Sequence, residues 1–243
     1  MINRKGGVGK TTSAVNISAA LALLGKRVLL VDTDTQAHAT LSLGVTSPEF
    51  TLLEVLLDGA RGAPLQVREN LFLVPSSSRL SDFEVEAVKK PRKMIALRHF
   101  LDAVAEEFDF AVLDAPPSLG VIVLSGLLAA EEAIVPMPPH FLALKGLAET
   151  KALIDKVSRK NPALRLAWIL PTFFNPQLRH TREVMQEIEK VFGRERILPP
   201  IKNSVRLTEA PALSQTIFEY APRSPLAEAY MRVANIILEG GAS

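Results

Sequence analysis

Apolar positions along the chain follow two patterns that alternate with one another. Short runs that are almost wholly apolar occur at residues 27–32, 71–75, 108–114, 133–136 and 164–170. Longer amphipathic stretches occur at residues 10–24, 94–107, 179–192 and 226–238. Short apolar runs are typical of strands buried on both faces, whereas a period of about 3.6 residues is typical of helices. The alternation predicts an α/β fold with a doubly wound, mostly parallel twisted sheet and helices on both faces.

A glycine-rich loop leads into the first predicted helix, and it reads Lys5-Gly6-Gly7-Val8-Gly9-Lys10-Thr11-Thr12. Glycines let the backbone turn with its N–H groups pointing inward, because no Cβ is in the way. These donors and the positive end of the helix dipole form an anion-binding cup. The loop therefore predicts a phosphate site, with Lys10 on the phosphates and the Thr11 hydroxyl on Mg²⁺. The alternative is an ordinary glycine-rich turn with surface lysines.

Composition narrows the class of protein. Of the 243 residues, 48% are hydrophobic and 22% are charged, as expected of a soluble globular protein. The absence of cysteine excludes disulfides, thiolate zinc sites and cysteine-ligated iron–sulfur clusters, and it fits a cytoplasmic protein. A net charge of +2 allows a nucleic-acid surface only as a local patch. The longest apolar run, Leu119–Ala130, is too short to span a bilayer.

The length of the chain is enough for one large α/β domain or two small ones, and we predict a single domain over residues 1–243. A phosphate-binding loop normally follows a buried strand, yet only Met1-Ile2-Asn3 precede this one. We therefore expect the first strand to be truncated, or the true start to lie upstream of Met1. For residues 46–70 we expect a loop and a short helix.

The loop departs from the usual pattern G-x-x-x-x-G-K-[ST]. The first glycine would fall on Arg4, and an additional lysine, Lys5, stands before Gly6-Gly7. This deviant Walker motif resembles that of the ParA/MinD family of P-loop ATPases, and the resemblance extends to the last predicted helix. It implies an ATPase that binds ATP and Mg²⁺ on residues Lys5–Thr12, with Lys5 and Lys10 acting on the phosphates.

Two carboxylates follow buried runs, at the sheet edge where nucleotides bind in doubly wound folds. Within Asp32-Thr33-Asp34-Thr35-Gln36, the resemblance implies that Asp34 orients the attacking water. The alternative is that Asp32 and Asp34 only cap the next helix. Asp114 precedes Pro116-Pro117 and resembles the family's Walker B carboxylate, which holds Mg²⁺ through a water. Its alternative role is also that of a helix cap.

Several positions depart from the family pattern. Thr35 replaces a proline, Ala37-His38 replaces Gly-Asn or Gly-Ser, and His140 replaces a glutamate. The first two changes leave the carboxylates in place but alter the loop that moves with the nucleotide. A lone histidine is more often a surface or packing residue than a catalyst, so the sequence assigns no chemistry to His140.

The resemblance also implies contacts with adenine and DNA. Asn175 lies in the loop that contacts adenine in this superfamily. Arg206 falls on a family arginine implicated in non-specific DNA binding, and Lys202 lies nearby. The second such arginine falls on Gln177, and Arg179 is a candidate replacement. The alternative for Lys202 and Arg206 is a solvated rim or a contact on the phosphate side.

Taken together, the resemblance implies an ATPase that forms a homodimer around two Mg·ATP molecules, with Lys5 of each copy reaching the other's phosphates. In its ATP state it would bind DNA non-specifically on the nucleoid. With a ParB-like partner it would position or segregate a chromosome, a plasmid or another large cargo.

Three rival functions remain open. A MinD-like ATPase on a membrane surface is disfavoured because the tail after Leu238 is neither basic nor long. A nucleotide-binding regulatory module with little turnover is kept open by Thr35 and the short first strand. A small-molecule kinase or synthetase would need an acceptor site, for which the sequence shows no motif.

Overall fold

Parallel strands form the centre of the computed structural model, which describes residues 1–59, 62 and 64–240. A four-stranded sheet has the order β2-β3-β1-β4, formed by β2 (Leu65–Arg68), β3 (Leu71–Val74), β1 (Val28–Asp32) and β4 (Phe110–Asp114). A second sheet pairs β5 (Glu132–Met137) with β6 (Arg165–Pro171). All described pairings are parallel except that of β2 with β3. The predicted α/β class with a mostly parallel sheet is confirmed.

Residues 1–3 lie between the two sheets. The Met1 ammonium donates to the Leu113 carbonyl at 2.6 Å, and the amide of Ala115 donates to the Met1 carbonyl at 3.3 Å. On the other side, the amide of Ile2 donates to the Ile134 carbonyl at 3.0 Å. This short segment occupies the place of a central strand between β4 and β5, although it is not assigned as one.

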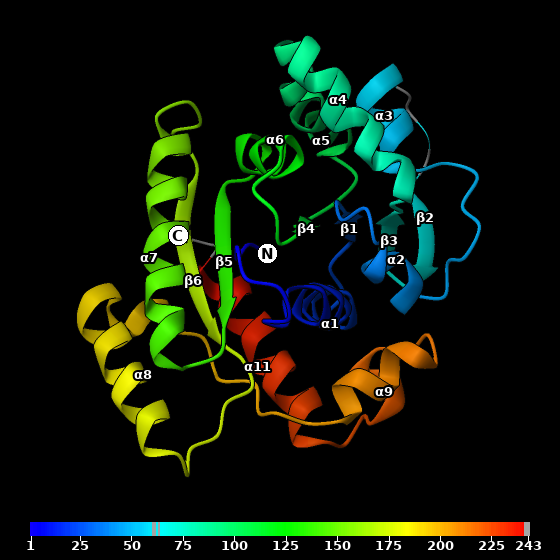
Figure 1. The fold of residues 1–243 in the computed structure, drawn as a ribbon. Helices are drawn as coiled ribbons and strands as arrows, with labels where there is room; N and C mark the ends of the chain where they lie inside the picture. Colours follow the sequence, from blue (N-terminus) through cyan, green and yellow to red (C-terminus); the bar gives the residue numbers. More distant parts are fainter. Residues whose placement is uncertain (60–61, 63, 241–243) are drawn as a thin grey trace.

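Helices cover both faces of the sheet (Figure 1). They are α1 (Lys10–Leu23), α2 (His38–Ser42), α3 (Leu52–Asp58), α4 (Ser81–Lys89), α5 (Ala96–Val104), α6 (Val121–Ala129), α7 (Phe141–Ser158), α8 (Arg179–Phe192), α9 (Arg206–Ala212), α10 (Ile217–Tyr220) and α11 (Pro225–Gly240). Three short 3₁₀ turns accompany them, η1 (Ser78–Leu80), η2 (Pro91–Ile95) and η3 (Arg194–Arg196). Among the described residues, no helix is both long and apolar enough to cross a membrane.

The burial of strand β1 explains why helices pack on both faces of the sheet. Successive side chains of a strand point to opposite faces, and every residue of β1 is buried. Val28 and Leu30 belong to the apolar cluster that contains α1 and α11, whereas Leu29 and Val31 belong to the cluster that contains α3 to α7. Because β1 is apolar at every position before Asp32, it contributes to two cores, one on each side of the sheet.

Several elements differ from the pattern-based expectation. Strand β2 lies within the segment expected to be loop and short helix, and its first two residues are exposed at the sheet edge. Helices α4 and α7 were not predicted, and residues 91–95 form a 3₁₀ turn at the start of the helix expected at 94–107. Residues 60, 61 and 63 of the expected loop, and residues 241–243 of the tail, lie outside the described residues.

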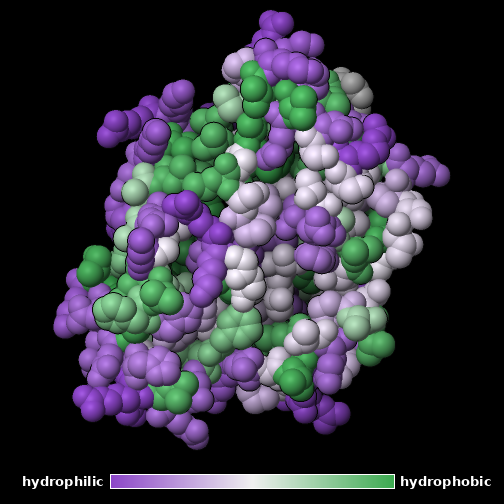
Figure 2. All heavy atoms as spheres, viewed as in Figure 1, coloured by the Kyte–Doolittle hydropathy of each residue, from purple (hydrophilic) through white to green (hydrophobic). Residues whose placement is uncertain are grey.

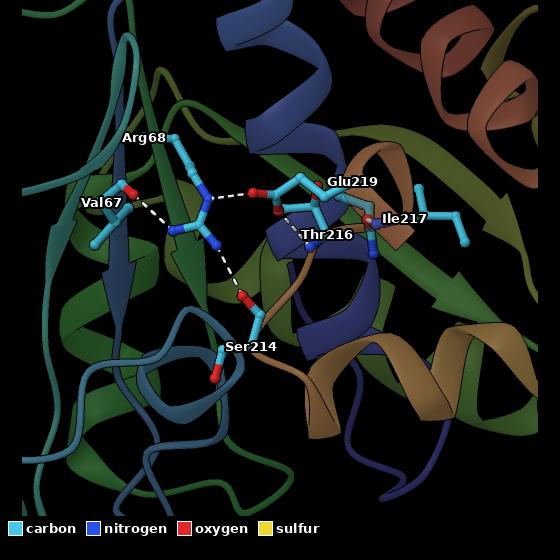
Figure 3. A network of polar contacts seen from close by, with 7 residues as sticks. Val67, Arg68, Ser214, Thr216, Ile217 and Glu219 are labelled. Carbon is cyan, nitrogen blue, oxygen red and sulfur yellow. Dashed lines mark hydrogen bonds and ion pairs between the residues drawn. The ribbon is translucent and has the colours of Figure 1, made fainter. Parts of the chain in front are cut away.

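A polar network fixes the segment between α9 and α10 to the rest of the fold (Figure 3). Arg68 of β2 donates to the Ser214 carbonyl at 2.7 Å and to the Glu219 carboxylate at 2.6 Å. The amide of Ile217 donates to the side chain of Asn16 on α1 at 2.8 Å. Helix α10 is therefore held against α1, the helix that follows the glycine-rich loop, and α9, which begins with Arg206, packs against α10 and α2.

Candidate nucleotide-binding site

The glycine-rich loop has the backbone conformation that its glycines permit. Gly7 and Gly9 have φ angles of +69° and +84°, which side-chain-bearing residues rarely adopt. Gly9 is the residue before α1, and its carbonyl accepts from the amide of Ser13 at 3.0 Å. The first-turn amides of α1 have no partners within the helix, so they are available to an anion at this end.

The loop is anchored from the β5–β6 sheet. The Asn3 side chain accepts from the amide of Lys5 at 3.0 Å and donates to the Pro136 carbonyl at 2.8 Å. The Thr172 hydroxyl, after β6, donates to the Val8 carbonyl at 2.9 Å. Sequence reasoning missed Asn3 and Thr172, whose only signal is a polar residue next to an apolar run.

A cleft of about 490 Å³ opens in front of the loop. It is lined by Gly6, Gly7, Gly9, Lys10, Thr11, Thr12, Asp34, Thr35, Gln36, His38, Pro116, Pro117 and Ser118. Three segments that the sequence analysis selected separately thus meet at one place. The volume lies within the range of about 300–1,000 Å³ that small-molecule sites occupy. Figure 2 shows pale, weakly polar residues across the middle of this face, with hydrophilic residues around its edge.

Lys10 lies inside the cleft rather than in solvent. Its side chain is buried, and its ammonium donates to the Lys5 carbonyl at 3.1 Å. Burial lowers the pKa of Lys10, while Asp114 and Asp34 act in the opposite direction. An ammonium paired only with a carbonyl can exchange that contact for a phosphate oxygen, which carries more charge.

Asp114 is fully buried, and neither carboxylate oxygen has a hydrogen bond of normal geometry within the described residues. Burial raises its pKa to about 7, and the nearby Asp32 adds to the rise. Part of this rise in the pKa of Asp114 is offset by the Thr11 hydroxyl, the Met1 ammonium and Lys10. An unpartnered buried carboxylate is costly, and a divalent cation would compensate it. Mg²⁺ at phosphate sites takes only one or two carboxylates, so Asp114 with Thr11 fits this ion.

Asp32 and Asp34 have different environments. Asp32 is fully buried, and its carboxylate accepts from the amide and the hydroxyl of Thr40 at 2.8 and 2.7 Å and from the amide of Asp34 at 3.1 Å. Asp32 therefore holds the loop at residues 33–37 and the start of α2, which is the capping role given above as its alternative. Asp34 instead lines the cleft and accepts from the amide of Gln36 at 3.0 Å.

Ala37 occupies a strained position in this loop. Its φ is +53°, in the left-handed region that favours glycine, and its amide donates to the Asp34 carbonyl at 2.9 Å. The family pattern has glycine at this position, and alanine adopts the same left-handed conformation here only with strain.

The structure places the remaining predicted residues outside the cleft. Asn175 accepts from the amide of Gln177 at 3.0 Å in a local turn and is not among the residues that line the cleft. Lys202 and Arg206 are exposed, and a bridge between Phe174 and Lys202 brings the loop after β6 beside them. Arg179 is exposed at the start of α8 and pairs with Glu183 at 2.7 Å.

Comparisons with known proteins agree with this geometry. A family model described as an AAA domain matches residues 1–166. The chromosome-partitioning ATPase Soj of Thermus thermophilus is 39% identical over 98% of this chain and 94% of its own length. The sporulation initiation inhibitor protein Soj of Bacillus subtilis is 34% identical over 98% of this chain and 97% of its own length.

Among solved structures, cobyrinic acid a,c-diamide synthase from Mycobacterium smegmatis with a bound ATP analog and magnesium is similar over its whole fold. The TM-score is 0.86 at 32% identity, covering 100% of this chain and 94% of that chain. The full-length similarity to Soj proteins and the geometry of the deviant Walker loop lead to one conclusion. The chain belongs to the ParA/Soj type of ATPases, within the ParA/MinD family of P-loop proteins.

Proposed function

We propose that this protein hydrolyses ATP to ADP and phosphate as a homodimer that binds DNA in its ATP state, and that it positions or segregates a large cargo with a ParB-like partner. One observation carries the ATPase proposal: the unpartnered carboxylate of Asp114 is buried close to Lys10 and Thr11, which line the cleft. That arrangement is unfavourable when empty and favourable around a magnesium-bound triphosphate.

Each cleft residue has a proposed role. Lys10 and the amides at the start of α1 would bind phosphate oxygens, while Thr11 and Asp114 would hold Mg²⁺, Asp114 through a water. The ion, when bound, would neutralise charge on the phosphates. Asp34 lines the same cleft and would orient the attacking water. Asn175 remains a candidate for adenine contact.

The position of Lys5 supports the homodimer. Its side chain is exposed and does not line its own cleft, so it is available to the phosphates of a second copy. Two triphosphates brought close repel one another, and a lysine from each copy would offset that repulsion in a site with little water.

DNA binding would follow from pairing. Arg206, Lys202 and Arg179 are exposed cations, and a dimer presents two such sets. A surface that binds weakly in one copy gains avidity when two copies engage the same duplex. ATP would thus load the protein onto the nucleoid, and hydrolysis would release it.

Sedimentation of the full chain tests the proposal. We expect a monomer without nucleotide, a dimer with Mg²⁺ and a non-hydrolysable ATP analogue, and DNA binding only in the second state. Steady-state ADP release, with and without DNA, measures turnover and separates an ATPase from a regulatory module. A chain that stays monomeric at saturating analogue would contradict the dimer.

A second candidate comes from the similarity to cobyrinic acid a,c-diamide synthase. An amide-forming synthetase couples ATP consumption to a nitrogen donor and an acid substrate. ADP release that requires glutamine and a carboxylic acid, and does not respond to DNA, would favour this candidate. Release of the protein from DNA on hydrolysis would favour partition. Co-sedimentation with anionic vesicles tests the membrane-surface alternative in the same nucleotide states.

A further inference from the structure

Lys5 is held at both of its backbone groups, while its side chain turns away from the cleft. Its amide donates to Asn3, and its carbonyl accepts from the Lys10 ammonium. The Lys5 ammonium lies 3.3 Å from Nε2 of His140. Neither Lys5 nor His140 is among the residues that line the cleft. The contact therefore fixes the direction in which the exposed lysine extends.

His140 presents its ring from a fixed backbone. It is the residue before α7, its amide donates to the Pro138 carbonyl at 2.9 Å, and its carbonyl accepts from the amide of Ala143 at 2.8 Å. An ammonium has donors but no acceptor, so a hydrogen bond between Lys5 and His140 requires a neutral imidazole with its lone pair on Nε2.

We propose that His140 is a positioning residue for Lys5: its neutral ring holds the lysine on the outer rim, directed toward a second copy, and protonation of the ring releases it. This inference rests on the proposed nucleotide-dependent dimer and adds a pH-dependent contact to it.

Burial and the charge of Lys5 lower the pKa of His140 below its ordinary value of 6.5, a hydrogen bond at its own backbone opposes this, and His180 lowers it further. The charged groups that face the ring are thus Lys5 of the loop and His180 of α8. Above the pKa of His140 the ring accepts from Lys5, and as pH falls through it two cations meet and repel. The hydrogen bond is therefore present at pH 7.5 and is lost as pH falls through the lowered pKa of His140, which lies below 6.5. The neighbouring side chains of Arg4 and Glu149 form an ion pair 2.8 Å apart.

Three full-length variants test the inference. His140→Gln keeps a neutral acceptor that does not titrate, His140→Ala removes the acceptor, and Lys5→Ala removes the donor. The dimer dissociation constant is measured by sedimentation with Mg²⁺ and a non-hydrolysable ATP analogue at pH 7.5 and 5.0. Analogue binding under dilute, monomeric conditions provides the control and is expected to be the same in the wild type and both His140 variants.

We expect acid to weaken the wild-type dimer about fivefold, as the loss of one hydrogen bond implies, and to leave His140→Gln within about twofold. His140→Ala should be about fivefold weaker at both pH values, and should add nothing to Lys5→Ala. Independently of dimerisation, the NMR titration of His140 should show a higher pKa in Lys5→Ala than in the wild type, because a nearby cation is removed.

The inference is overturned if His140→Gln loses as much affinity in acid as the wild type, if His140→Ala dimerises as tightly as the wild type, or if Lys5→Ala leaves the pKa of His140 unchanged. A wild-type chain that never dimerises overturns the dimer of the proposed function, and with it the positioning role of His140. Dimerisation that is insensitive to His140 overturns this inference alone.

Discussion

The nucleotide cleft and the candidate DNA surface are built in opposite ways. At the cleft, Lys10 and the nearby Asp114 are buried, and the loop beside them is fixed by hydrogen bonds with residues more than 130 positions away in sequence. Of the candidate DNA-binding residues, Lys202 and Arg206 are exposed, and Arg179 has one surface ion pair. Buried charges have few alternative partners, whereas exposed ones exchange water and salt freely. We therefore expect all-or-none effects in the cleft and graded, salt-dependent effects on the surface.

The largest effect is expected from Lys10→Ala. The change removes the only lysine among the residues that line the cleft, so ATP affinity should fall by about 100-fold or more, and every nucleotide-dependent behaviour with it. Titration with a fluorescent ATP analogue measures the loss. Lys26→Ala is the matched control, because that half-exposed lysine lies just after the far end of α1, outside the cleft, and pairs with Asp109. If Lys26→Ala lost as much ATP affinity as Lys10→Ala, the effect would not be specific to the cleft.

Asp114→Asn should make the nucleotide-free protein more stable and at the same time weaken its binding of nucleotide. The variant no longer buries an unpartnered carboxylate, so the nucleotide-free protein should gain about 1–3 kcal/mol in free energy of unfolding. The Mg²⁺-dependent part of nucleotide affinity should disappear at the same time. Urea unfolding and ATP titration with and without Mg²⁺ measure the two effects. The control, Asp102→Asn, changes an exposed aspartate of α5 and should do neither. A destabilised Asp114→Asn protein would show that the carboxylate has a partner in solution.

Arg206→Ala should produce a graded effect on the DNA surface. Among the described residues Arg206 forms no ion pair, so its charge is free for a phosphate. DNA affinity in the ATP state should fall several-fold, and the slope of log affinity against log salt should decrease by about 0.9 for each phosphate that is no longer neutralised. Arg179→Ala should have a smaller effect, because Arg179 must first leave Glu183. An unchanged slope in Arg206→Ala would place Arg206 on the solvated rim.

The smallest effect is expected from Ala37→Gly. Glycine adopts the φ of +53° without strain, so the free energy of unfolding should rise by about 1 kcal/mol, partly offset by the greater freedom of glycine in the unfolded chain. Thermal unfolding of the nucleotide-free protein measures it. A decrease in stability would mean that the Ala37 methyl group packs favourably enough to outweigh the strain.

The features that could be predicted from the sequence are those that depend on residues close together in the chain. The strand before Asp32 is apolar at every position, and Gly7 and Gly9 adopt the backbone conformation that their lack of a side chain allows. Lys10, Asp34 and Asp114 could be assigned to one site because parallel strands bring their carboxyl ends to the same edge.

The rest depends on partners that are distant in sequence. Thr172 contacts Val8 and His140 contacts Lys5 only because β5 and β6 fold beside the loop. Strand β2 is half exposed, and its pairing with β3 rather than its own composition makes it a strand. Asp32 and Asp34 look equivalent in sequence, and only their hydrogen bonds distinguish the support of the loop from the lining of the cleft.

The three residues between β4 and β5 have a consequence for motion. Among the described residues, few backbone hydrogen bonds join residues 1–3 to β4 and β5, and the loop that follows them is held by Thr172 after β6. Local opening along such a segment is easier than opening of a fully paired strand. An occupant of the cleft that stiffens the loop would therefore slow amide hydrogen exchange along β4 and β5, in residues that never touch it. In this fold, the phosphate-binding loop directly follows the three residues that join the two sheets.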